Sequence, residues 1–225
     1  MSLLDTMPLR TVTLRVQARW QLAMLSPVAF VRYFVRTLDT HDKIQPVKRF
    51  PWRRPHIVPL IRLWQHNPLL SIRKSRQMLI TWLFAALSLW DALHPGRLVM
   101  VQSKRLEDAI GDEYTGDGPL GRAKFILSHI PAAVGLVEGR HYEKHSIRVR
   151  FPVWNSAVWA IPQGANIIRQ RTASGIWSDE SHFQEEFGDA YAASAPCIRG
   201  GGWFVSTSTA NPGAALALHE DRLDV

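Results

Sequence analysis

A basic turn between an apolar strand and an apolar helix is the first segment with residues suited to chemistry. It reads Arg-Lys-Ser-Arg-Gln-Met-Leu-Ile-Thr over residues 73–81. A turn that binds phosphate needs free backbone N–H groups at a helix N-terminus, a cation, and a hydroxyl group for Mg²⁺. Thr81 supplies the hydroxyl group, and the helix that follows supplies the dipole. Against the pattern GxxxxGK[ST], however, Leu79 replaces glycine and Ile80 replaces lysine, so a basic turn without special function is an alternative.

Two carboxylates end a second apolar segment, Ile-Trp-Ser-Asp-Glu at residues 176–180. At the end of a strand, Asp179 would lie near Mg²⁺ and Glu180 near the water that attacks a γ-phosphate. Acidic pairs also occur as ordinary N-terminal residues of helices, and the chain looks helical from His182. The apolar residues before the pair favour the strand.

Hydroxyl groups end a third apolar segment, Gly-Trp-Phe-Val-Ser-Thr-Ser-Thr at residues 202–209. Ser206 and Thr207 follow the carboxylate pair by about 25 residues, where P-loop motors often carry a residue that senses the γ-phosphate. Alone, such a run would indicate only a polar turn.

Strands and helices must alternate to position these three segments. The pattern of apolar residues predicts strands at 69–73, 97–102, 147–151, 157–161, 175–178 and 202–205. It predicts helices at 14–25, 27–38, 56–65, 81–93, from about 104, 120–130 and 182–193, with a linker at 45–55 and a loop at 111–121. This alternation predicts an α/β fold with a mainly parallel sheet covered by helices on both faces.

The order of the three segments resembles the N-terminal ATPase domain of the large terminase subunits of tailed phages, which are ASCE-type P-loop NTPases. Residues 74–77 followed by Thr81 look like the family's phosphate loop, KxRQxGxS/T (its Walker A motif), in which the lysine stands at the front. Asp179-Glu180 looks like the Walker B pair, and residues 205–207 look like the coupling motif. The departure is Leu79, which replaces a family glycine and adds a side chain close to the phosphates.

The resemblance implies ATP and Mg²⁺ as cofactors and assigns a role to each site residue. Lys74, Arg76 and Glu180 would be catalytic: Lys74 would neutralise the phosphates and Glu180 would activate water. Thr81 and Asp179 would hold Mg²⁺. The nucleotide would be bound by Lys74, Ser75, Arg76, Gln77, Met78, Leu79, Ile80 and Thr81, together with Ser206 and Thr207.

The sequence alone leaves open which arginine would contact the γ-phosphate. Arg76 is the first candidate within the chain, with a salt bridge to an acidic neighbour as its alternative role. Arg171 is a second candidate, and a neighbouring subunit could also supply the group.

The spacing of apolar residues predicts an N-terminal helical arm at residues 1–45. The resemblance, which covers roughly residues 45–215, implies that residues 46–215 are the P-loop ATPase domain and that residues 216–225 are the start of a lid or linker to a C-terminal nuclease domain that this chain lacks. No nuclease activity is expected of these 225 residues. The Pro-rich stretch at 51–65 lies where the family contacts adenine.

Charge indicates a polyanionic partner. The formal net charge is +8, and residues 1–76 hold 14 Lys and Arg against three acids. Such a block favours nucleic acid as the partner. The alternative is a basic face that is only exposed to solvent. Trp52, flanked by Arg49 and Arg53, could stack on adenine or on a DNA base.

The cysteine content and the apolar runs indicate the cellular compartment. The single cysteine, Cys197, rules out an intrachain disulfide and is expected to be an inert thiol. The apolar run at 78–90 is too short to cross a bilayer. We expect no membrane partner, and a protein of the host cytoplasm that acts in viral assembly and is absent from the mature virion.

The sequence therefore predicts the ATPase of a viral DNA-packaging motor, which moves double-stranded DNA into a procapsid. The expected partners are the DNA, the portal protein, the small terminase subunit and further copies of the chain in a ring. The alternatives are another DNA-dependent ATPase and a non-hydrolysing nucleic-acid-binding module with a decayed P-loop.

Overall fold

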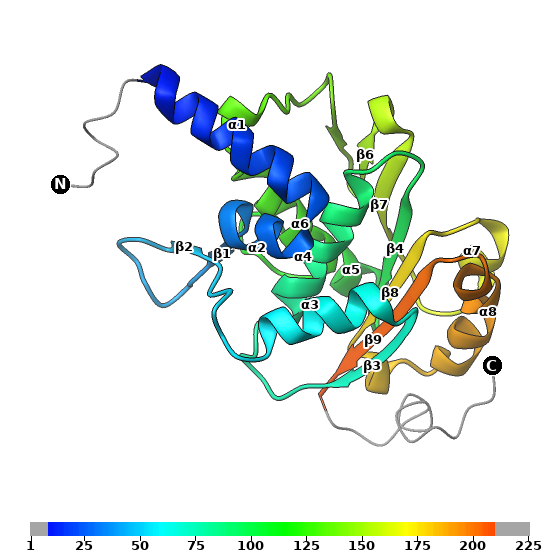
Figure 1. Cartoon of the computed structure of the whole chain (residues 1–225). Helices are drawn as coiled ribbons and strands as arrows, with labels where there is room; N and C mark the ends of the chain where they lie inside the picture. The colour runs from blue at the N-terminus through cyan, green and yellow to red at the C-terminus, as the bar shows by residue number, and fades with distance from the viewer. Residues whose placement is uncertain (1–8, 210–225) are drawn as a thin grey trace.

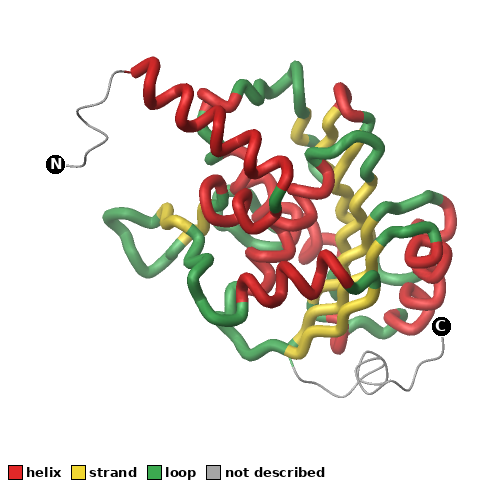
Figure 2. The backbone as a smooth tube through the Cα atoms, in the orientation of Figure 1, coloured by secondary structure: helices red, strands yellow, loops and turns green. Residues whose placement is uncertain are grey.

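A seven-stranded sheet forms the centre of the protein, of which a computed structural model describes residues 9–209 (Figures 1 and 2). The strand order is β3-β9-β8-β4-β7-β6-β5. The first five strands pair in parallel, and β6 and β5 pair antiparallel at one edge. The strands are β3 (Leu69–Arg73), β4 (Leu98–Gln102), β5 (Glu143–Lys144), β6 (Arg148–Phe151), β7 (Ser156–Ile161), β8 (Gly175–Asp179) and β9 (Trp203–Ser208).

Helices cover both faces of this sheet, which confirms the predicted layers. On one face lie α4 (Ile80–Ala92), α5 (Leu106–Ile110) and α6 (Pro119–Ser128). On the other lie α7 (Asn166–Gln170), which the sequence analysis did not predict, and α8 (Phe187–Arg199) (Figure 1). Short 3-10 turns occur at η1 (Ala132–Val134), η2 (Pro152–Trp154) and η3 (Ser181–Phe183).

Alternating side chains divide the interior into two cores. Trp177 of β8 and Val205 of β9 belong to the core under α4. Their neighbours Ile176 and Phe204 belong to the core under α8. Because successive residues of a strand point to opposite faces, the central strands are apolar on both sides, as the sequence indicated.

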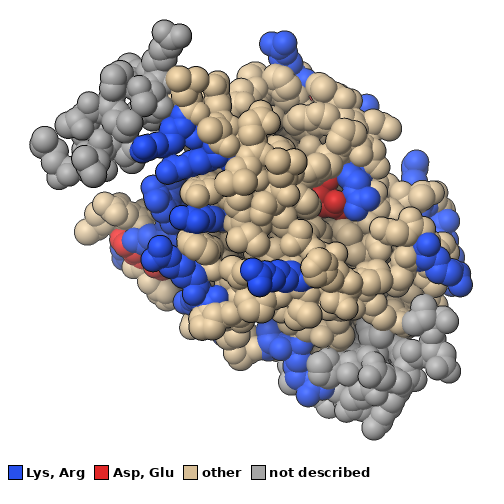
Figure 3. Space-filling model, in the orientation of Figure 1, with Lys and Arg blue, Asp and Glu red and all other residues tan. Residues whose placement is uncertain are grey.

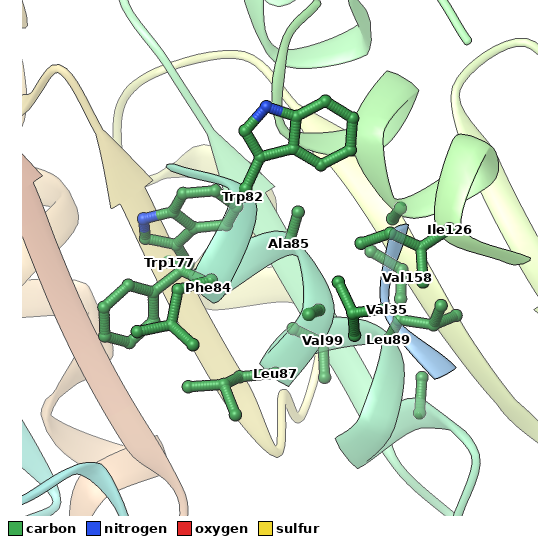
Figure 4. Close-up of a cluster of buried hydrophobic side chains, with 14 of the residues drawn as sticks. Val35, Trp82, Phe84, Ala85, Leu87, Leu89, Val99, Ile126, Val158 and Trp177 are labelled. Carbon is green, nitrogen blue, oxygen red and sulfur yellow. The ribbon is translucent and has the colours of Figure 1, made fainter. Parts of the chain in front are cut away.

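Helix α4 is buried on all sides, which fixes its first turn. Eleven of its 13 residues are buried. Figure 4 shows its side chains between Val99, Val158 and Trp177 of the sheet and Val35 and Ile126 from outside it. A helix packed all round cannot shift without disturbing the close-packed core, so the hydroxyl group of Thr81 is held in place.

The N-terminal arm consists of α1 (Leu9–Leu25), α2 (Pro27–Phe34) and a hairpin of β1 (Arg36–Leu38) and β2 (Val47–Arg49). The prediction of a helix over 27–38 and a linker over 45–55 was therefore partly wrong. The chain leaves α2 at Val35, whose carbonyl accepts a hydrogen bond from the amide of Phe50. This bond joins the end of the predicted helix to the predicted linker, and the residues between them pair as β1 and β2. Helix α3 (Ile57–His66) follows.

The prediction of a helix from residue 182 was also wrong at its start. Residues after β8 first form η3, and α8 begins at Phe187. Gln184 holds the intervening turn, because its side chain donates to the carbonyl of Asp179 at 2.7 Å and accepts from Ser178 at 3.0 Å.

Residues 9–209 contain no helix long and apolar enough to span a membrane. The predicted start of a lid at 216–225, and the ends of the predicted arm and ATPase domain at 1–8 and 210–215, lie outside the described residues.

Candidate functional site

Three predicted segments meet at one edge of the sheet. Lys74 directly follows β3, Asp179 ends β8, and Thr207 lies near the end of β9. Strands β3, β9 and β8 are parallel neighbours, so their carboxyl ends share an edge. Ligands of open α/β sheets bind outside this edge.

The ammonium group of Lys74 connects the segments. Its Nζ atom lies 2.8 Å from Oγ1 of Thr81, 3.0 Å from Oδ1 of Asp179 and 3.4 Å from Oε1 of Glu180. The side chains of Lys74 and Asp179 are only 8% and 6% exposed, whereas that of Glu180 is 37% exposed. A paired, buried cation is thus next to a carboxylate that solvent can reach.

Strand β9 contributes a second layer of hydroxyl groups. Thr207 donates to Oδ1 of Asp179 at 2.7 Å and accepts from the indole of Trp177 at 2.9 Å. Ser206 instead bonds to the hydroxyl group of Ser181 at 2.7 Å. Both are buried, so Thr207 orients the site carboxylate, while Ser206 holds the turn that follows it.

The turn from β3 to α4 combines two left-handed residues with amides that have no backbone partner among the described residues. Leu79 adopts the left-handed conformation, with φ 59° and ψ 19°, and Gln77 has φ 63°. Within residues 9–209, no backbone carbonyl accepts a hydrogen bond from the amides of residues 75 to 79. The first bonded amide of the helix is that of Leu83. Free amides at a helix N-terminus are the usual donors to phosphate oxygens.

The turn that precedes α3 forms hydrogen bonds with the turn between β3 and α4. The side chain of Arg54 donates to the carbonyl of Gln77 at 3.3 Å, and Nε2 of His56 bonds to the carbonyl of Met78 at 3.1 Å. These residues belong to the Pro-rich stretch for which the sequence predicted contact with adenine. The structure brings that stretch against the turn.

Two adjoining cavities lie over the site, and both are lined by Thr81, Glu180 and Arg122. One, of about 310 Å³, is walled by residues 74–82 and also by Thr209. The other, of about 500 Å³, is walled by Ser103 and by Asp179 among others. Of the ten residues predicted to bind nucleotide, the eight at 74–81 line the first cavity, whereas Ser206 and Thr207 do not.

Arg122 is the site residue that the sequence analysis missed. It lies on α6, and its Nε donates to the carbonyl of Gly116 at 2.8 Å while its guanidinium group lies 5.3 Å from the ring of Trp82. Burial lowers the pKa of Arg122, and the carboxylates of Asp179, Asp117 and Glu180 act in the opposite direction. No motif marks it, because its position depends on how α6 packs against α4.

The arginine candidates from the sequence have different positions. Arg76 is exposed at the rim of the first cavity and forms no salt bridge with any residue in the range 9–209. Arg171 precedes β8 and packs on Trp159, 5.9 Å from its ring. It therefore lies at the amino end of β8, opposite Asp179, and cannot serve this site within the same chain.

The oxygen donors at the edge fit Mg²⁺. The described residues include no group of three or more His, Cys, Asp and Glu that could hold a metal alone. Mg²⁺ commonly takes one or two protein carboxylates and completes its shell with water and phosphate. The hydroxyl group of Thr81 and the carboxylate of Asp179, both bonded to Lys74, match that arrangement.

No family model matches the chain, and no curated protein sequence matches it either. Among solved structures, the fold is similar to that of a phage large terminase. The crystal structure of the HK97 bacteriophage large terminase superposes with a TM-score of 0.59 at 13% sequence identity, covering 88% of this chain and 40% of that one. The chain thus spans less than half the length of that terminase. The similarity shows a terminase-like α/β fold.

Proposed function

We propose that this chain is the ATPase of a phage DNA-packaging motor, which hydrolyses ATP with Mg²⁺ to move double-stranded DNA. The observation that supports this most directly is the contact of Lys74 with Thr81, Asp179 and Glu180. It joins a phosphate-type turn to a carboxylate pair on a terminase-like fold. By the same resemblance, the motor would be a ring of such chains that docks on a portal protein and works with a small terminase subunit.

In this mechanism the residues position and stabilise charge, which is most of what phosphoryl transfer requires. The free amides of residues 75 to 79 and the ammonium group of Lys74 bind the phosphates. Thr81 and Asp179 would hold Mg²⁺, which would neutralise charge on the phosphate oxygens. Because Glu180 is exposed to the cavity, it can orient water and accept a proton from it.

Arg122 supplies the remaining positive charge. Arg122 lines both cavities together with Glu180, and contacts with Gly116 and Trp82 fix the orientation of its guanidinium group. A cation held in advance near the developing charge needs little reorganisation during the reaction. We assign to Arg122 the role first considered for Arg76.

Steady-state ATP hydrolysis with Mg²⁺ tests the proposal, with Glu180→Gln as the main variant. We expect wild-type turnover and at least a hundredfold slower hydrolysis in the variant, because Gln cannot accept the proton. Glu185→Gln is the matched control, since Glu185 is an exposed carboxylate outside both cavities. Nucleotide binding should persist in both variants.

An inert wild type without nucleotide binding, even at concentrations that allow ring assembly, would contradict the proposal. The chain would then be a nucleic-acid-binding module with a decayed P-loop. Hydrolysis that is unchanged in Glu180→Gln would instead place the catalytic base elsewhere.

A further inference from the structure

Three arginines and two aromatic rings alternate across the surface of the N-terminal arm. The guanidinium carbons of Arg19 and Arg32 lie 5.0 and 4.8 Å from the ring centre of Tyr33. Those of Arg32 and Arg53 lie 4.7 and 5.5 Å from the ring centre of Trp52. We call this set, Arg19-Tyr33-Arg32-Trp52-Arg53, the arginine–aromatic row. It joins α1, α2 and the turn after β2.

The hairpin beside the row adds further positive charge. Arg36 and Arg49 are direct partners in the antiparallel register of β1 and β2. The pKa of Arg36 is lowered, first by burial and then by the charge of Arg49. Like charges placed opposite each other destabilise a strand pair, so the fold keeps an unfavourable arrangement here. Figure 3 shows Lys and Arg side chains gathered over this part of the molecule.

Few acids offset this charge. Between residues 9 and 56 the chain has only two, Asp39 and Asp42, and Asp42 pairs with Lys48. Within the described range, no arginine of the row or of the hairpin pair forms a salt bridge. The charge is therefore available to an anionic partner.

Stacking gives the arginines a definite geometry. A guanidinium group packed on a ring loses part of its freedom before it binds, so less entropy is lost on binding. Its fork of N–H donors matches phosphate oxygens. A row of such groups on helices and a hairpin suits a partner with regularly spaced phosphates.

Both rings are already in contact with arginine. Tyr33 and Trp52 each have two guanidinium groups over the ring, and these groups compete with a base for the ring surface. Binding of single strands relies on base stacking on open aromatic rings. The row therefore favours a duplex held by its backbone over stacking of Trp52 on adenine or a DNA base.

We propose that the arginine–aromatic row and the Arg36–Arg49 pair bind the phosphate backbone of double-stranded DNA without reading its sequence. The choice of DNA over duplex RNA rests on the proposed function. The surface also adjoins the ATPase site, because Trp52 and Arg53 of the row directly precede Arg54 and His56, which bond to the carbonyls of the phosphate turn.

The test compares two triple variants that remove the same charge. The first is R19Q/R32Q/R53Q. The control is R148Q/R150Q/R171Q, which changes exposed arginines of β6 and of the segment before β8. Affinity for a 30-base-pair duplex is measured without nucleotide over a range of salt concentrations. We expect the row variant to bind at least tenfold more weakly and its salt dependence to fall by about 0.9 per lost phosphate contact, with little change in the control.

Equal losses in both variants would overturn the proposal, because they would show a response to net charge alone. Preference for single-stranded DNA of the same length, or equal row-dependent binding to vesicles of anionic lipid, would overturn it as well. If the row bound duplex RNA as tightly as duplex DNA, the assignment of DNA as the partner would be overturned. Because nucleotide is absent, an inactive ATPase would refute the proposed function and leave this result intact.

Discussion

Leu79 takes a backbone conformation that favours glycine, at the position where the resembled family has glycine. Left-handed backbone costs an L-residue about 1–2 kcal/mol, and such strain often occurs at functional sites. The turn between β3 and α4 therefore adopts, at Leu79, a conformation that glycine would take without strain. Glu180, with φ 52°, is in the same strained region.

Replacing Leu79 tests this conformation. Leu79→Gly and Leu79→Ala both remove the side chain, but only glycine relieves the strain. We expect the glycine variant to be more stable than the alanine variant by about 1 kcal/mol, measured by urea unfolding. At an ordinary helical position the alanine variant would instead be the more stable one, by about 1 kcal/mol. A more stable alanine variant would show that the turn is not left-handed at Leu79.

Arg122 is the second residue with a definite expectation. Arg122→Gln should lower kcat by about a hundredfold or more, the usual effect of removing one charge-stabilising donor, while nucleotide affinity changes much less. Lys124→Gln is the control, since Lys124 lies on the same helix and bonds to the carbonyl of Ser146 instead. Equal losses of kcat and affinity would point to a structural role for Arg122.

At this scale the sequence selected Thr81, Asp179 and Thr207 by residue type and order, and Lys74 by the resemblance of its loop to the loop of the terminases. The structure brings these four side chains into contact. Their distances could not be predicted, since these depend on which strands are neighbours. Arg122 could not be found at all, because its contacts are made by α4 and by the connection between α5 and α6.

At the scale of elements, the apolar pattern located the central strands and α4 because burial on both faces leaves long apolar runs. The hairpin was harder to predict. Its two strands are three residues each, too short to show a clear alternation of apolar and polar residues. Strand β1 also follows α2 almost directly, so the sequence gives no clear sign of where the helix ends. The start of α8 depended on hydrogen bonds of Gln184 that no local pattern reveals.

The glycine-rich connection between α5 and α6 determines where Arg122 lies. Gly118 has φ +64°, and a Cβ atom there would meet the carbonyl oxygen of Asp108 at 2.5 Å. Gly139 has φ +80°, but a Cβ atom there would meet nothing within 4 Å. Both positions impose backbone strain on alanine, and only the first adds a steric clash with backbone.

Gly118→Ala should therefore destabilise the protein more than Gly139→Ala, by about 2 kcal/mol, in urea unfolding. Because Gly118 caps the N-terminus of α6, Gly118→Ala should also slow ATP hydrolysis at temperatures where the protein is folded. Equal stability of the two variants would mean that the connection can adjust without strain.

For the whole molecule, the single cysteine offers a probe of how closely α8 packs on the sheet. Cys197 lies on α8, on the face of the sheet opposite α4. Burial raises the pKa of its thiol from 9.0 to about 11. The thiolate is the reactive form, so at pH 8 the native thiol has about a hundredfold less of it than an unperturbed one. This agrees with the expectation of an inert thiol.

Alkylation of Cys197 by iodoacetamide at pH 8 should therefore be about a hundredfold slower than that of a free thiol, because the partly buried thiol is mostly protonated. Raising the pH from 9 to 11 should accelerate it as the native thiol ionises. Because the unfolded thiol ionises first, the free energy of unfolding should fall through the same range. Mass spectrometry follows the reaction at this one site. Alkylation at the rate of a free thiol at pH 8 would show that the packing of α8 on β9 does not protect Cys197.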